Sequence, residues 1–70
     1  MKISARNQFS GKIKKITVGQ INAEVTIALP GGFEIVAVIT KSAVKSMGLR
    51  KGAPAVAIVK ASNVLVAVDE

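Results

Sequence analysis

Groups that donate hydrogen bonds gather at three points along this sequence, close to where elements of regular structure begin or end. They are Ser4, Arg6 and Asn7 near the start, Thr40 and Ser42 near the middle, and Lys60 and Ser62 later in the chain. Donors without acceptors suit a fully deprotonated oxyanion, whereas a protonated phosphate also needs an acceptor such as a carboxylate. No acidic residue lies beside any of these points, so the residues favour a tetrahedral dianion such as molybdate, tungstate or sulfate.

Each of these donors also has a plainer structural interpretation. Thr40 can cap the N-terminus of a helix, and Ser4 and Arg6 can be ordinary surface residues. Lys60 and Ser62 can flank a solvated turn at the end of a strand. The residue types therefore leave anion binding and these structural roles both open.

Nucleophilic and acid–base catalysis lack their usual residues in this chain. It contains no His and no Cys, which excludes Ser-His and Cys-His pairs and most transition-metal sites. Two of its acids, Asp69 and Glu70, fall in the final segment, and the Gly31-Gly32 pair lacks the spacing of a phosphate loop. We expect a binding protein rather than an enzyme, with no bound metal cation and no organic cofactor.

Length and composition predict a single domain, residues 1–70, that depends on association for its stability. A chain this short buries only about 60% of its unfolded surface, and without Cys it forms no disulfides. The runs 35–39 and 64–68 are apolar without alternation, so both faces of each run require burial. One small barrel has a single interior, and we therefore expect a homo-oligomer.

The net charge of +6 indicates an anionic partner. No apolar run approaches the ~20 residues of a membrane span, and no secretory signal opens the sequence, so we expect a cytoplasmic protein without membrane contact.

Small barrels that bind single-stranded nucleic acid stack bases on aromatic rings, and this chain has only Phe9 and Phe33. Nucleic acid is therefore not the expected partner, and the lysines at 12, 14 and 15 are interpreted as a solvated strand face.

A period of two in the apolar residues predicts a mostly β fold. We expect a first strand or extended arm over residues 3–9, then strands over 12–18, 21–29, 34–39 and 55–60, and a last strand from residue 63. Thr40 begins a short helix that ends at Gly48. The order of three strands, a helix and two strands predicts an all-β, OB-fold-like five-stranded Greek-key barrel with one short helix.

The segments SARNQFSGKI, NAEV, VITKSAV, MGL and IVKASNV, in this order and spacing, resemble the Mop family of small molybdate-binding proteins, the molbindins, built on the TOBE/Mop domain. The resemblance covers essentially the whole chain. It implies a barrel that exchanges strands or packs tightly with a partner, and a hexamer arranged as a trimer of dimers. It also implies that oxyanions bind between subunits.

The resemblance further implies which residues hold the oxyanion. The main site falls on Ser4, Arg6, Thr40, Lys60, Ala61 and Ser62, partly through backbone N–H groups. Members of the family often carry Ser where this chain has Ala43, and Ser42 is the neighbouring hydroxyl that joins the set here. A second site, near the three-fold axis, falls on Gln20 and Asn22.

We interpret the chain as a stand-alone copy of this domain that binds molybdate or tungstate for intracellular storage and buffering. The alternative from another class is a basic OB-type nucleic-acid-binding protein, which would shift RNA or single-stranded DNA in a salt-dependent way. A third interpretation is a structural assembly module whose anion sites no longer bind.

Overall fold

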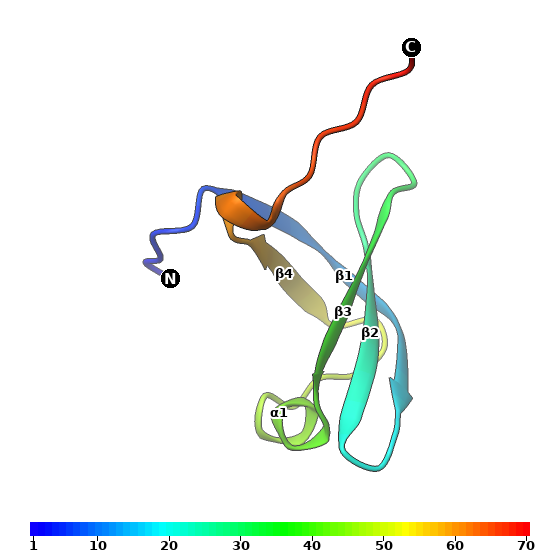
Figure 1. The fold of residues 1–70 in the computed structure, drawn as a ribbon. Coiled ribbons are helices and arrows are strands. Elements are labelled where there is room, and N and C mark those ends of the chain that lie inside the picture. The colour runs from blue at the N-terminus through cyan, green and yellow to red at the C-terminus, as the bar shows by residue number, and fades with distance from the viewer.

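Four strands pair into one curled antiparallel sheet (Figure 1). A computed structural model describes all residues from 1 to 70. The strands are β1 (Asn7–Val18), β2 (Asn22–Ala28), β3 (Glu34–Thr40) and β4 (Pro54–Val59), in the spatial order β3-β2-β1-β4. This order places the fourth strand beside the first, which is the Greek-key arrangement predicted from the sequence.

Strand β1 is one continuous element, whereas the sequence predicted an arm over 3–9 and a separate strand over 12–18. Its first half pairs with β4 and its second half with β2, and Lys12 has partners on both sides, Pro54 and Ala28. Gly11 lies where the sheet bends, and a Cβ there would collide with the carbonyl oxygen of Ala28. The predicted break at Ser10-Gly11 is therefore a site of close backbone approach within a strand.

The short helix forms as the sequence predicted. Helix α1 (Lys41–Ser46) follows β3, and the Thr40 side chain accepts a hydrogen bond from the Ala43 N–H at 3.0 Å. Gly48 adopts a φ of +62° just beyond the helix, the left-handed conformation that ends many helices. A second, 3-10 helix, η1 (Ala61–Asn63), follows β4. Neither helix has the length or apolar character needed to cross a lipid bilayer.

The hydrophobic core is small and lies on the concave face of the sheet. Only five of 70 residues are buried, and four of them, Ile13, Val25, Ile27 and Ala57, form one cluster. Large apolar side chains remain exposed on the outward face of the edge strands, including Val36 and Val38 on β3 and Val56 and Ile58 on β4. A core of this size gives a lone subunit little stability, as the sequence indicated.

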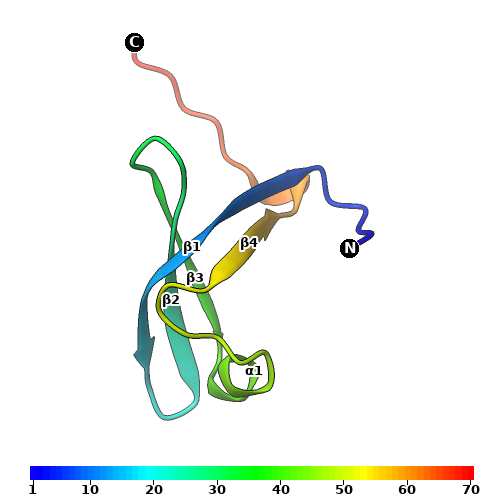
Figure 2. The ribbon, with the colours of Figure 1, turned by 180° about the vertical axis from the view of Figure 1, so that it is seen from behind.

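The predicted fifth strand does not form within the subunit, so the sheet has four strands and is not closed into a barrel. Residues 64–70, here called the tail, extend away from the sheet (Figures 1 and 2), and Leu65 is 93% exposed. Both edge strands, β3 and β4, line a hollow of about 540 Å³ on the concave face, and almost all of its lining residues are apolar. The last run of the chain is thus apolar and extended, as expected, but has no strand beside it.

Candidate oxyanion-binding site

The pairing of β1 with β4 brings together two groups of donors that are distant in the sequence. Asn7, the first residue of β1, lies opposite Val59, the last residue of β4. The segment before β1 and the segment after β4 therefore meet and line a hollow of about 450 Å³, here called the η1 hollow. Its lining residues are Ser4, Ala5, Arg6, Lys60, Ala61 and Ser62. Five of these are residues that the sequence analysis placed in the main site.

The η1 hollow offers backbone donors as well as side chains. Helix η1 has Lys60 as its N-cap residue, without a side-chain cap, and no acidic residue in its first turn. The backbone N–H groups of Ala61 and Ser62 donate none of the loop, turn or side-chain hydrogen bonds of the chain. Two N–H groups, two hydroxyls and the cations of Arg6 and Lys60 are thus available to an anion.

The other donors of the predicted main site line a second hollow at the start of α1. This α1 hollow measures about 440 Å³ and is lined by Gln20, Ile21, Thr40, Lys41, Ser42 and Lys45. The β1–β2 turn contributes the first two of these residues, and the Lys41 N–H donates to the Ile21 carbonyl oxygen at 2.7 Å. The backbone bond holds the turn against the first residue of the helix, so that Gln20 faces the same hollow as Thr40.

Thr40 is a helix cap, and its side chain also takes part in the α1 hollow. Its Oγ1 accepts the Ala43 N–H and lies 3.2 Å from Ser42 Oγ. A hydroxyl that accepts one hydrogen bond can still donate its own proton, so capping and ligand binding are compatible. The capping role that the sequence left open is confirmed.

The two hollows lie at opposite ends of the subunit. Figure 1 shows η1 and the N-terminal segment at one end of β1, and α1 with the β1–β2 turn at the other. The seven residues predicted for the main site are therefore divided, and Thr40 and Ser42 do not meet Arg6 and Lys60 within one chain. Of the predicted second set, Gln20 lines the α1 hollow, and Asn22 lies opposite Thr40 in the β2–β3 ladder.

No carboxylate lines either hollow, and both carry two cationic side chains. The chain also has no cluster of His, Cys, Asp or Glu that could hold a metal ion. The electrostatics therefore favour anions, and the shortage of acceptors favours an anion without a proton.

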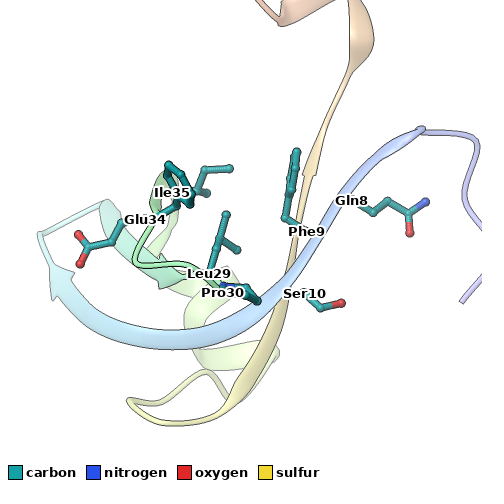
Figure 3. A pocket seen from close by; sticks show the side chains of 8 residues that line it. Gln8, Phe9, Ser10, Leu29, Pro30, Glu34 and Ile35 are labelled. Atoms are coloured by element: carbon teal, nitrogen blue, oxygen red, sulfur yellow. The ribbon is translucent and has the colours of Figure 1, made fainter.

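A third hollow has a different chemical character. It measures about 720 Å³ and lies between the first half of β1 and the β2–β3 hairpin, next to the apolar edge of the sheet. Figure 3 shows Phe9, Leu29 and Ile35 directed toward a common space, while Gln8 and Glu34 point away from it. Apolar side chains that project together in this way suit a hydrophobic neighbour rather than an anion.

Comparison with known proteins places these features in a family. The TOBE domain family matches residues 3–66 of the chain. The chain belongs to this family. Within it, the resemblance to the Mop proteins that the sequence motifs indicated is confirmed by a relative that is matched over its whole length. A probable molybdenum-pterin-binding protein of Haemophilus influenzae is 45% identical, and the match covers 99% of this chain and 100% of the relative. The molybdenum transport protein ModE of Herbaspirillum seropedicae is 44% identical over 99% of this chain.

The two relatives differ in how much of their length this TOBE domain matches. The chain spans all of the Haemophilus influenzae protein but only 26% of the ModE sequence.

Among solved structures, the cytoplasmic molybdate-binding protein ModG, in a crystal form with molybdate bound, superposes with a TM-score of 0.89. It is 52% identical, and the match covers 93% of this chain and 46% of ModG. The curled sheet with one short helix is thus the fold of this family.

Two residues of the α1 hollow in this TOBE domain were not identified from the sequence. Lys41 and Lys45 line the hollow with Thr40 and Ser42. The sequence contains a signal for both residues. Lys41 directly follows the capping Thr40, and Lys45 is four residues further on, so the two lysines share one face of the helix. Lys45 is also in the last turn of the helix, where its charge interacts favourably with the helix dipole.

Proposed function

We propose that this TOBE domain binds molybdate or tungstate between the subunits of a homo-oligomer and serves to store and buffer the oxyanion in the cytoplasm, without catalysis. The observation that carries the proposal is the division of a donor-rich set without carboxylates between two ends of one chain. Each half holds cations and donors but cannot surround a tetrahedral ion alone. An α1 hollow of one subunit facing the η1 hollow of another would supply donors from both sides.

Three further observations support assembly. A core of five buried residues is small, both edges of the sheet lack a neighbouring strand, and the tail exposes apolar side chains. A tail from one subunit inserted between β3 and β4 of another would cover the concave hollow and complete a fifth strand. We propose a hexamer built as a trimer of such dimers. Native mass spectrometry with added molybdate measures subunit number and bound ions together, and a lone subunit would contradict this proposal.

Ligand selectivity follows from the lining of the hollows. Phosphate keeps a proton near neutral pH and would present a donor to hollows that contain no carboxylate to accept it. We expect tight binding of molybdate and tungstate, and weak binding of phosphate, in isothermal titration calorimetry. Phosphate affinity equal to molybdate affinity would show that the missing acceptor does not govern selection.

A site shared between chains also couples binding to stability. A ligand present at about 100 times its Kd stabilises the state that binds it by about 2.7 kcal/mol. We expect molybdate to raise the melting temperature of the assembly more than sulfate does at equal ionic strength. A melting curve unchanged by excess molybdate would favour the interpretation in which the anion sites no longer bind.

Arg6→Ala tests the η1 half of the site. Loss of a hydrogen bond from a charged group is expected to weaken molybdate binding by about 1.5–3 kcal/mol. Lys2→Ala is the matched control, because Lys2 is exposed, lies outside both hollows and carries the same charge. Equal affinities for the parent, the variant and the control would remove Arg6 from the site.

Mixed assemblies test whether one site draws on two chains. Arg6→Ala subunits keep an intact α1 hollow, and Ser42→Ala subunits keep an intact η1 hollow. Each variant alone is expected to bind weakly at every site. Unfolding and refolding the two together should restore tight binding at those interfaces where the intact halves face each other. Mixing without any recovery would place all ligand contacts within a single chain.

A further inference from the structure

The outward face of β1 carries a basic surface that is separate from both donor hollows. Ile13 is buried, and Lys12 and Lys14 flank it along an extended strand, so both point to the opposite face. Lys15 lies opposite Thr26, which alternates with the buried Val25 and Ile27 and therefore also points outward. Three lysines within four residues thus share one face of the sheet.

A β-bulge produces this arrangement. The register between β1 and β2 shifts between Ile13 and Lys15, which leaves Lys14 as the extra residue. In an unbulged strand one of two neighbouring lysines would point into the core. The bulge instead lets Ile13 and Ile16 both face inward while Lys14 and Lys15 both face outward.

The turn before β4 extends the basic surface. Ile13 donates its N–H to the Ala53 carbonyl oxygen at 2.9 Å and accepts the Gly52 N–H at 2.8 Å. These bonds hold Arg50 and Lys51, both exposed, next to the bulged part of β1. We call the set of Lys12, Lys14, Lys15, Arg50 and Lys51 the basic face.

Most of this charge is not neutralised within the chain. Lys14 forms an ion pair with Glu34, the single salt bridge of the structure. Glu24 lies opposite Thr17, beyond the bulge, and the remaining acids, Asp69 and Glu70, are at the end of the tail. Lys12, Lys15, Arg50 and Lys51 therefore form no ion pair within the chain, although Glu24 shares the outward face with them.

The shape and chemistry of the basic face indicate what it contacts. None of its residues lines a hollow, so it does not enclose a small ion. It includes no aromatic ring on which a base could stack. On the outward face the exposed apolar side chains lie on the edge strands, such as Val36 and Val56, and Phe9 and Val18 of β1 lie opposite the buried Ala57 and Ala23; the basic face thus has apolar side chains beside it but no apolar centre. A solvent-exposed surface of cations without an aromatic ring or an apolar centre suits an array of phosphates.

We propose that the basic face binds the phosphate backbone of double-stranded nucleic acid, without sequence preference and independently of the oxyanion sites. Lysine and arginine contacts to phosphates require neither base stacking nor a pocket. The shortage of aromatic residues, which argues against single-stranded binding, does not bear on this mode. In an oligomer, several copies of the face would act on one duplex and increase the apparent affinity.

The test is fluorescence anisotropy with a labelled 24-base-pair DNA duplex of arbitrary sequence, from 50 to 200 mM NaCl. Each phosphate contact contributes about 0.9 to the slope of log K against log salt. Lys12→Gln combined with Lys15→Gln is expected to lower the magnitude of this slope by about 1.8 per bound subunit. Arg50→Gln combined with Lys51→Gln serves as an independent second variant, located in a turn instead of in the sheet.

The matched control neutralises the same number of cations elsewhere. Lys2→Gln removes one charge outside the basic face and outside both hollows; it is compared with Lys12→Gln alone and is expected to leave duplex affinity and slope unchanged. Equal losses in this control and in Lys12→Gln would show a diffuse charge effect and overturn the proposal. Absence of duplex binding by the parent at 50 mM NaCl would overturn it as well.

Three further arms of the experiment separate this proposal from its competitors. Saturating molybdate is expected to leave duplex affinity unchanged, and displacement of the duplex would place the contacts in the oxyanion hollows instead. Polyglutamate of equal total charge is expected to compete poorly, and equal competition would assign the face to an acidic protein surface. A matched RNA duplex determines whether the contact depends on helix geometry, and binding only to single strands would contradict the proposal.

Discussion

Strand β3 and the tail have nearly the same composition but very different surroundings. Residues 35–39 and 64–68 are both runs of valine, alanine, isoleucine or leucine without alternation. β3 pairs with β2 along its whole length, and its residues 35, 37 and 39 are half-buried. In the tail, Leu65, Val66 and Val68 are 93%, 88% and 81% exposed, and none of them belongs to a strand.

The difference lies in the availability of a neighbour and not in the residues themselves. A short turn at 30–33 brings β3 directly against β2. The tail follows β4, which lies at one edge of the sheet, but η1 directs the chain away from that edge. Strand propensity alone therefore does not make a strand, because backbone pairing and side-chain burial must be supplied by another segment.

The largest expected effect comes from deleting residues 64–70. If the tail is buried in a second subunit, the assembly loses burial of several apolar side chains, at about 1.5–3 kcal/mol each. We expect dissociation and a large fall in melting temperature, measured by native mass spectrometry and circular dichroism. A synthetic peptide of sequence VLVAVDE, added to the truncated protein, should restore part of the stability. A truncated protein that keeps its assembly and melting temperature would show that the tail has no structural role.

A single substitution sharpens the same comparison. Leu65→Ala is expected to cost about 2–5 kcal/mol if Leu65 is buried in a partner. The same change costs less than about 0.5 kcal/mol at an exposed position, which is its position in one subunit. Denaturant unfolding above and below the concentration at which the assembly dissociates distinguishes the two cases. An equal and small effect at both concentrations would mean that Leu65 stays in solvent.

The smallest effect concerns an interaction that β3 has and the tail lacks. The ion pair between Lys14 and Glu34 links β1 to the start of β3, with both side chains substantially exposed. Glu34→Gln is expected to cost only about 0.2–1 kcal/mol, and the difference should shrink in 1 M salt as screening increases. A double-mutant cycle with Lys14→Gln measures the coupling. A loss of several kcal/mol would mean that the pair has a larger role in positioning β3 than its exposure indicates.

Much of the fold could be predicted from the sequence because its local signals agree. Period-two alternation identified β2, and apolar runs with turn signals identified β3 and β4. Thr40 and Gly48 marked the two ends of the helix. The continuity of β1 was missed, because Ser10-Gly11 has turn composition and the need for glycine near Ala28 arises only from the tertiary bend.

The candidate site was predictable in its residue types but not in its arrangement. The donors were recognised because hydroxyls and cations without nearby acids have a specific chemical use. The meeting of the Ser4 and Lys60 segments depends on the register of β1 with β4, which pairs Asn7 with Val59 across more than 50 residues of sequence. Their separation from Thr40 depends on the same long-range pairing, and no local pattern encodes it.

The unbroken course of β1 determines the separation of the two donor hollows of one subunit. This strand of 12 residues begins beside the η1 hollow and ends at the turn that borders the α1 hollow. At about 3.3 Å per residue its contour length is roughly 40 Å. The length of β1 therefore fixes the separation between the η1 hollow and the α1 hollow. A two-residue insertion in β1 would preserve which side chains face inward but move one end by roughly 6.6 Å, and under the proposed shared site it would misalign the two hollows of neighbouring subunits.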